Sequence, residues 1–99
     1  MAAPEDSLPD YETFARHAGE TVRLIAGDVQ RDGRIAEVGA LNRQPGQARQ
    51  PFSLVVVAEG EALPQQTLTL EHEALGELQL FLVPVGPRDG GMAYEAVFT

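Results

Sequence analysis

A period of two in the apolar residues dominates the second half of the chain and limits what it can fold into. Leucines alternate with polar residues over Thr67–Glu71 and again over Glu77–Pro84. Successive side chains of a β-strand point to opposite faces, so this pattern predicts two strands that bury one face in a common core. Phe52–Ala58 is apolar on both faces and is expected to be a central strand, covered on both sides.

Three weaker alternating segments predict three more strands, and turn signals separate them. The turn signals are Asp32-Gly33 and Pro87–Gly91, because Gly and Asp favour tight turns. The short connections favour antiparallel pairing, and we expect one mainly β domain, either a small antiparallel β-sandwich or a partly open barrel of about six strands. The three additional predicted strands are Thr21–Ala26, Arg34–Leu41 and Ala93–Phe98.

The N-terminal region is the one part of the chain with a helical period. Asp10 precedes it as a candidate N-cap and Gly19 follows it. We divide the chain into a flexible lead-in, residues 1–9, and a single β domain, residues 10–99. The helix is expected to cover the strand that carries Phe81 and Val83, whose outer face is not polar. Four residues share the predicted apolar helix face: Tyr11, Phe14, Ala15 and Ala18.

Composition excludes several classes of function. The 99 residues carry a net charge of −8 and contain no Cys and no Lys, so disulfide, thiolate and Schiff-base chemistry are excluded. A net acidic chain repels nucleic acids and anionic membranes, and we expect neither as a partner. The longest apolar run, Leu54–Ala58, is too short to span a membrane, and residues 1–10 lack a signal-peptide pattern. A cytoplasmic location is the resulting expectation.

The sequence indicates no catalytic, cofactor-binding or metal-binding residues. The two serines, Ser7 and Ser53, lack the surroundings of an activated nucleophile. His72 lies between Glu71 and Glu73, which raises the possibility of a metal site. Neighbours on a strand point to opposite faces, however, and His17 is expected to lie far away. We therefore interpret residues 71–73 as an exposed hairpin tip in which His72 serves turn geometry or local hydrogen bonding.

For two other parts of the chain, Glu95 and residues 42–50, the sequence predicts exposure to solvent. Glu95 lies in an apolar strand, where simple alternation with Tyr94 and Ala96 places its carboxylate on the outer face. Residues 42–50 combine Pro, Gly, Arg and Gln and are expected to form a solvated, mobile loop, a type of segment that often carries function.

The chain contains a series of short motifs: Phe14, His17 and Gly19, then Pro51–Leu54, Leu63–Gln66, Leu70–His72, Leu75-Gly76, Leu80–Gly86 and Tyr94–Phe98. Together they resemble a bacterial family of small uncharacterised proteins, known only as a domain of unknown function. The resemblance spans about residues 11–99, implies no activity, and is loosely associated with phage-tail-like components, which implies an accessory or assembly role. His72 and Gln65 are the polar members that packing alone does not require.

These observations favour a non-catalytic structural or protein-interaction module. It would bind a protein partner, or a second copy of itself as a homodimer, through an exposed strand edge. The candidate edges are the first strand, Thr21–Ala26, and the last, Ala93–Phe98. A small-molecule-binding domain with a mouth lined by Phe52, Phe81 and Tyr94 is the alternative, and a metal-dependent enzyme around His72 is a weaker one.

Overall fold

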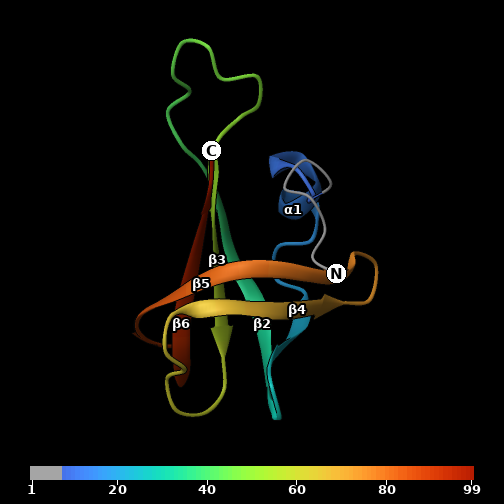
Figure 1. Ribbon diagram of the computed structural model, residues 1–99, viewed down its shortest axis with the longest axis vertical. Helices are drawn as coiled ribbons and strands as arrows, with labels where there is room; N and C mark the ends of the chain where they lie inside the picture. The colour runs from blue at the N-terminus through green and yellow to red at the C-terminus, as the bar shows by residue number, and fades with distance from the viewer. Residues whose placement is uncertain (1–7) are drawn as a thin grey trace.

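The computed structural model describes residues 8–99, so residues 1–7 of the lead-in predicted for residues 1–9 lie outside the described residues. Leu8, which was assigned to that lead-in, instead packs against the core. One helix and six strands follow in the order of Figure 1. They are α1 (Tyr11–Arg16), β1 (Thr21–Ala26), β2 (Val29–Ala40), β3 (Phe52–Ala58), β4 (Gln66–His72), β5 (Gly76–Arg88) and β6 (Gly91–Phe98).

The six strands form a closed barrel in the order β1-β2-β3-β6-β5-β4. Every neighbouring pair is antiparallel, which confirms the mainly β, antiparallel fold with one short N-terminal helix. In Figure 1, β4 and β5 cross in front of β3 and β6, and the far ends of β2, β3 and β6 continue beyond the crossing. The barrel therefore has a compact body and an extension made of three strands.

The predicted turn at Asp32-Gly33 is wrong, because these residues lie inside β2. The chain turns earlier, at Gly27-Asp28, so that β1 and β2 form a tight hairpin with Ala26 opposite Val29. Gly33 has a packing role instead: a Cβ at this position would collide with the carbonyl oxygen of Val57 on β3. A glycine can therefore mark a close approach of two backbones as readily as a turn.

The second turn prediction needs a smaller correction. Pro87 and Arg88 still belong to β5, and the turn itself is Asp89-Gly90, where both residues have positive φ. Pro87 is tolerated near the end of β5, where it follows a bulge between Pro84 and Gly86 in the ladder with β6.

The core occupies the barrel interior and follows the predicted alternation. Leu68 and Leu70 on β4 share it with Leu78, Leu80 and Leu82 on β5. On β3 the inward residues are fully buried, but Ser53 and Val55 are partly exposed, so this strand is not covered on both sides as expected. The other buried core residues are Phe14, Val22, Leu24, Ile35, Phe52, Leu54, Val56, Ala58, Leu63, Tyr94 and Ala96.

Helix α1 closes the end of the barrel body with a cluster of aromatic rings. Asp10 is its N-cap: the carboxylate accepts a hydrogen bond from the Thr13 N–H at 2.9 Å. Hydrogen bonding to Thr13 holds the pKa of Asp10 below its ordinary value. Phe14 is fully buried, with its ring centroid 5.7 Å from those of both Phe52 and Phe98. The helix thus fastens the β2–β3–β6 extension to the body.

The helical prediction is wrong in two respects. The helix ends at Arg16, and Ala15 and Ala18 are exposed, so only Tyr11 and Phe14 form its packing face. The helix also leaves β5 uncovered, because Phe81 remains 53% exposed. The aromatic partners of Tyr11 and Phe14 lie on β3 and β6 rather than on β5.

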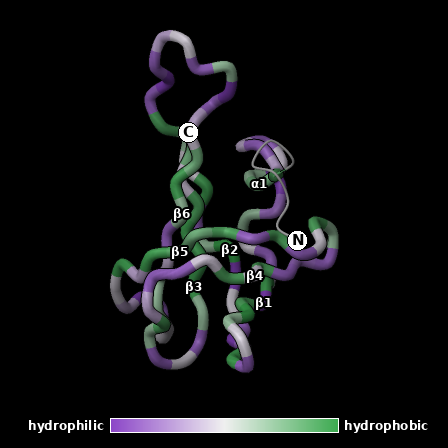
Figure 2. Tube along the Cα trace, viewed as in Figure 1, coloured by the Kyte–Doolittle hydropathy of each residue, from purple (hydrophilic) through white to green (hydrophobic). Residues whose placement is uncertain are grey.

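The loop between β2 and β3 projects from the end of the extension and is mostly hydrophilic (Figure 2). This loop, which the sequence predicts to be mobile, contains several hydrogen bonds between its own residues. The Arg43 guanidinium donates to the carbonyls of Gln47 and Ala48. The Gln50 side chain donates to the Leu41 carbonyl, and Leu41 N–H donates to Pro51. Close ends and internal bonds are features of a compact Ω-loop.

Candidate functional site

The barrel has two joints where its ladders are incomplete. Of the two predicted edge strands, β1 lies at the first joint and β6 at the second. At the first joint, β1 pairs with β4 over only three residue pairs, from Arg23 opposite Glu71 to Ile25 opposite Thr69. At the second, the ladder between β5 and β6 begins at Arg88 opposite Gly91 and ends at Val83 opposite Glu95. Neither β1 nor β6 is a free edge along its whole length. The edge prediction is wrong for Arg23–Ile25 of β1 and for Met92–Glu95 of β6, which are paired on both sides.

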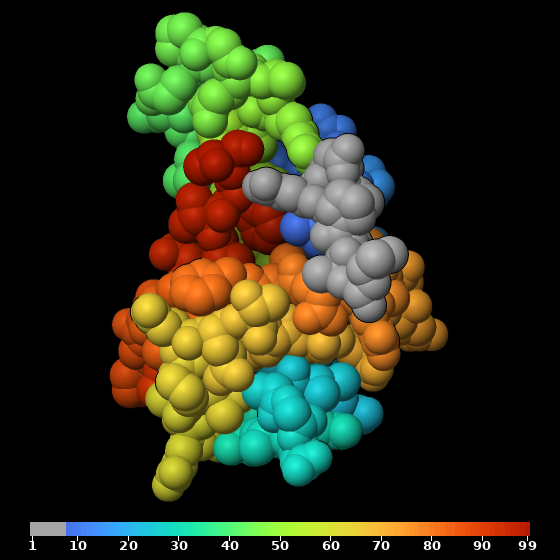
Figure 3. All heavy atoms as spheres, in the orientation of Figure 1, coloured from blue at the N-terminus to red at the C-terminus, as the bar shows by residue number. Residues whose placement is uncertain are grey.

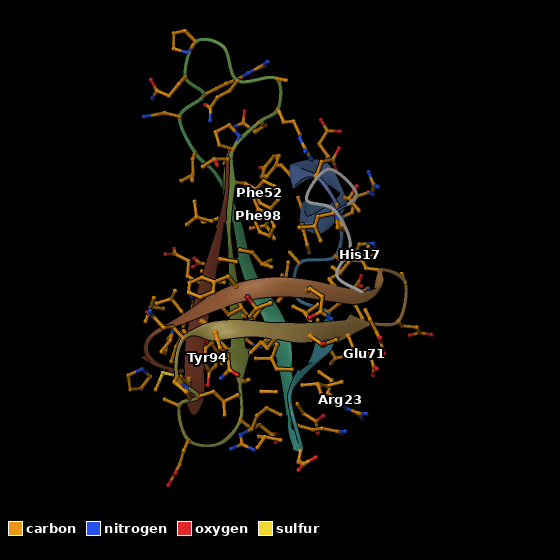
Figure 4. All side chains as sticks on the ribbon, in the orientation of Figure 1. His17, Arg23, Phe52, Glu71, Tyr94 and Phe98 are labelled. Atoms are coloured by element: carbon orange, nitrogen blue, oxygen red, sulfur yellow. The ribbon has the colours of Figure 1, made fainter. Side chains whose placement is uncertain are left out.

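The β5–β6 joint opens because β5 turns away to follow β4. Residues 79–82 of β5 pair with β4, while Ala96–Phe98 of β6 continue the ladder with β3 alone. Phe98 and Tyr94, labelled in Figure 4, lie on opposite sides of the crossing β5 ribbon. The last residues of β6 therefore carry a free edge on the side that faces away from β3.

A groove of about 410 Å³ occupies this opening. Phe81 and Val97 stand beside it with 53% and 58% of their surfaces exposed, two of the largest apolar exposures among the described residues. In Figure 3 the end of β6, in red, lies above the orange surface of β5. The lining residues come from β5, β6 and the segment before α1: Leu8, Gln79, Leu80, Phe81, Val83, Glu95, Ala96, Val97 and Phe98.

Among the described residues that line this groove, Glu95 supplies the only charged side chain. It lies on the outer face, as alternation predicts, and is half-buried beside Val83 and Val55, its neighbours in the two ladders. Within residues 8–99, no Arg or His nitrogen lies within 4.0 Å of its carboxylate. The Glu95 oxygens are not among the described buried polar atoms that lack a partner, so they are accessible to a cationic group of a ligand in the groove.

The first joint, between β1 and β4, is bridged by a polar cluster that was not predicted. Oε1 of Glu20 lies 2.8 Å from Nδ1 of His17 and 2.8 Å from Nε2 of His72. The two imidazole rings are 4.8 Å apart, edge to face. His17 was expected to lie far from His72, and this expectation is wrong because the chain after α1 leads directly into β1, beside the end of β4.

His72 is buried, with 3% of its side chain exposed, so the prediction of an exposed tip is wrong. Its predicted role in turn geometry is confirmed: Nδ1 accepts hydrogen bonds from the N–H groups of Ala74 and Leu75, at 3.0 and 3.1 Å. Since Nδ1 is an acceptor in both bonds, the ring proton resides on Nε2, which donates it to Glu20.

These three residues could be considered for a metal ion, since their ligand atoms all lie within 4.8 Å of one another. A metal-ligating histidine normally donates its second ring N–H to an acceptor. His72 shows the reverse arrangement, because Nδ1 faces two N–H donors. If Nε2 bound a metal ion, the ring proton would have to move to Nδ1. Nδ1 already accepts two hydrogen bonds from the turn, so the turn would have to rearrange. The donor set therefore fits a hydrogen-bonded bridge better than a resident ion.

The cluster has an electrostatic consequence for Glu20. Hydrogen bonds from His17, and then from His72, hold the pKa of the Glu20 carboxyl below its ordinary value of 4.5. The carboxylate therefore stays ionised over a wide pH range and ties the start of β1 to the end of β4. It adds a polar link to a joint in which the backbone ladder contributes only three residue pairs.

The remaining sequence candidates are dispersed. Glu71 points away from His72, as predicted, and lies 3.9 Å from Arg23 at the surface. Gln65 is exposed in the connection before β4. Ser53 is partly exposed on the outer face of β3.

The predicted ligand mouth does not form. Phe52 and Tyr94 are buried inside the barrel, while Phe81 points outward. The Tyr94 hydroxyl oxygen accepts a hydrogen bond from the Leu63 N–H at 2.9 Å, which fixes the ring in the core. Alternation along β5 places Phe81 on the face opposite its neighbours Leu80 and Leu82.

Sequence reasoning missed Glu20 and the groove. Glu20 has no distinctive local pattern, and only the fold brings it to His72, which is 52 positions away. For the groove a signal exists: Phe81 and Val97 are apolar at positions that alternation assigns to the outer face. Apolar residues on an outer face indicate either a covering element or a partner.

The fold and the groove define a small closed β-barrel closed at one end by a short helix, with an apolar opening in its wall. The chain matches the family model of a domain of unknown function, DUF6916, over residues 9–98, and it belongs to this family. No curated protein and no solved structure matches the chain. Within the described residues, no helix is long and apolar enough to cross a membrane.

Proposed function

We propose that the chain is a non-catalytic module that docks on a protein partner through the groove between β5 and β6. The exposed apolar side chains of Phe81 and Val97 beside this groove support the proposal most directly. Contiguous exposed apolar surface on a small acidic domain is a feature of interaction sites. The docking position differs from the whole-strand edges that alternation alone favoured, because about half of each of these two strands is paired on both sides in the closed barrel.

Binding of a small molecule inside the barrel has less support. The interior is occupied by the side chains of the core, including the fully buried Leu24, Ile35 and Leu54. Six strands enclose less space than the roughly eight needed to hold even a small ligand. A ligand in the groove itself would meet an open surface rather than an enclosed pocket.

An accessory or assembly role beside phage-tail-like components is the biological setting that the sequence resemblance implies, and it belongs to the same proposal. A closed barrel with an apolar groove in its wall suits such a role, since the groove offers a surface on which another protein can pack. Identification of the partner would test the setting separately from the site.

The experiment compares two substitutions on the outer surface. Val97→Asp places a charge in the groove, whereas Val85→Asp places the same charge on another exposed valine, which does not line the groove. Each tagged protein is incubated with extract from the source cell, and the captured proteins are quantified by mass spectrometry. Circular dichroism and thermal melting establish that both variants fold.

The proposal predicts a protein captured by the wild type and by Val85→Asp, and captured at least about tenfold less by Val97→Asp, since central apolar contacts dominate interface energies. Equal capture by both variants would contradict docking at the groove. Failure to enrich any protein, from extracts in which the chain is expressed, would also count against a docking module.

A further inference from the structure

We propose that the occupant of the groove is an extended segment of a protein partner, which adds as a strand to β6 and carries a basic residue opposite Glu95. This inference rests on the proposed docking function and specifies the chemistry of the partner. Three properties of the groove carry it: a free strand edge, flanking apolar side chains and a carboxylate without a cation.

The strand edge is the first property. Ala96–Phe98 pair with Phe52–Leu54 of β3 on one side, and the ladder with β5 ends one residue earlier, at Glu95. Backbone N–H and C=O groups that point away from β3 in this segment therefore have no β5 partner. Such edges accept an added strand, whose main-chain hydrogen bonds supply affinity. The short edge suits a segment of about five residues, a usual strand length.

The apolar side chains determine which face of the added strand is recognised. Val97 on β6 and Phe81 on β5 flank the opening, and Leu8 lines it as well. An extended segment presents alternate side chains to the same face. A partner with apolar residues at every second position would bury them against Phe81 and Val97 while its backbone pairs with β6.

Charge selects among segments of this kind. Within residues 8–99, Glu95 is the one charged residue of the groove lining, and no Arg or His pairs with it. The whole chain carries a net charge of −8. An arginine or lysine of the partner can satisfy Glu95 directly and is drawn toward the protein by its overall field. Two copies of this chain would repel each other at long range, which disfavours the chain itself as the occupant.

The test is selection from a displayed library of random ten-residue peptides against the full-length protein. The inference predicts enriched peptides in which apolar residues alternate and an arginine or lysine recurs at one position. The most enriched peptide is then synthesised, and its affinity is measured by fluorescence anisotropy with the wild type and three variants.

Each variant isolates one part of the site. Val97→Asp should abolish binding, and Glu95→Gln should weaken it about three- to tenfold, with most of the salt dependence lost, as expected for a single partly desolvated ion pair. Val85→Asp should bind as the wild type does. N-methylation of alternate peptide backbone nitrogens should weaken binding at one register and not at the other, because only one register pairs with β6.

Three results would overturn the inference: no enrichment over the starting library, enriched peptides without basic residues, or binding that Glu95→Gln and N-methylation leave unchanged. A Val97-dependent dimer seen by light scattering would replace the peptide partner with a second copy, and would also overturn it. If the capture experiment still shows Val97-dependent docking, the proposed function survives and only the strand-adding, basic occupant is excluded.

Discussion

The two incomplete joints of the barrel are handled in opposite ways. Where β1 meets β4, three ladder pairs are reinforced by the Glu20 carboxylate, which joins the rings of His17 and His72. Where β5 leaves β6, no described polar contact bridges the opening, and the exposed side chains are apolar. The β1–β4 joint, which hydrogen bonds close, contributes to stability. The β5–β6 joint, which apolar groups line, leaves exposed surface that a partner would cover. Closure of this barrel is therefore not uniform around its wall.

Apart from Leu80→Ala, which serves below as a core comparison, His72→Ala should have the largest effect on stability. The substitution removes the bond to Glu20 and the acceptor of two turn N–H groups, and it leaves a cavity at a buried position. We expect a loss of about 2–3 kcal/mol in the free energy of unfolding, measured by urea denaturation. Glu73→Ala, at the exposed neighbouring position, is the control and should change little. A loss no greater than that of the control would show that the cluster does not hold the β1–β4 joint.

Gly33→Ala tests the close contact of β2 with β3 in the barrel body. The new methyl group would collide with the Val57 carbonyl, so that the strands must move apart. We expect a loss of about 1–3 kcal/mol, again from denaturation. Gly39→Ala is a matched control on the same strand, because its nearest neighbour would be the Ser53 Oγ at an ordinary 3.5 Å. Equal stability of the two variants would contradict the register given for this part of the barrel.

Glu20→Gln should alter the pH dependence of stability more than its value near neutrality. The folded-state pKa of Glu20 lies below 4.5 because of the bonds from His17 and His72. The unfolded chain therefore binds this proton first, and the contribution of Glu20 is present above the unfolded pKa and is lost as pH falls through the folded pKa. Thermal melts from about pH 6 to about pH 3 should fall less steeply for the variant than for the wild type. Parallel curves would mean that the cluster does not lower this pKa.

Phe81→Thr should have the smallest effect on stability and a large effect on docking. Phe81 lies on the outer face beside the open joint, so we expect a loss of only about 0.5 kcal/mol. Capture of the partner should nevertheless fall as it does for Val97→Asp. The adjacent Leu80→Ala, which removes a buried side chain, should cost about 2–5 kcal/mol. Similar losses from the two substitutions would contradict the inward and outward assignment of β5.

Local alternation was enough to predict the strands of this fold. The bounds of β1 and β3 match the expected ones, and β4, β5 and β6 differ only at their ends. β2 begins at Val29 instead of the expected Arg34, because a turn was predicted at Asp32-Gly33. Period-two patterning records which face of a strand is buried, and it therefore identified the core leucines and the outward position of Glu95. It does not record which strands are neighbours, so the closure of the barrel and the pairing of part of both edges could not be predicted.

The site depends on contacts between distant parts of the chain, which no local pattern reports. The meeting of His17 with His72 requires the end of α1 to lie beside the β4–β5 hairpin. Gly33 was assigned to a turn because an Asp-Gly pair favours tight turns. The collision that excludes a larger residue at this position comes from Val57, on another strand, and no local pattern reports it. The outward-facing Phe81 was visible in the sequence, but the sequence alone did not show that α1 would leave it uncovered.

Residue-resolved amide hydrogen exchange of the free protein tests the central claim most directly. A strand paired on both sides protects nearly every amide, whereas a strand paired on one side protects only alternate amides. The account predicts continuous protection in β6 through Tyr94 and Glu95, followed by alternating slow and fast amides over Ala96–Phe98. Uniform slow exchange through Phe98 would show that the β5–β6 joint is closed, and it would contradict the docking groove.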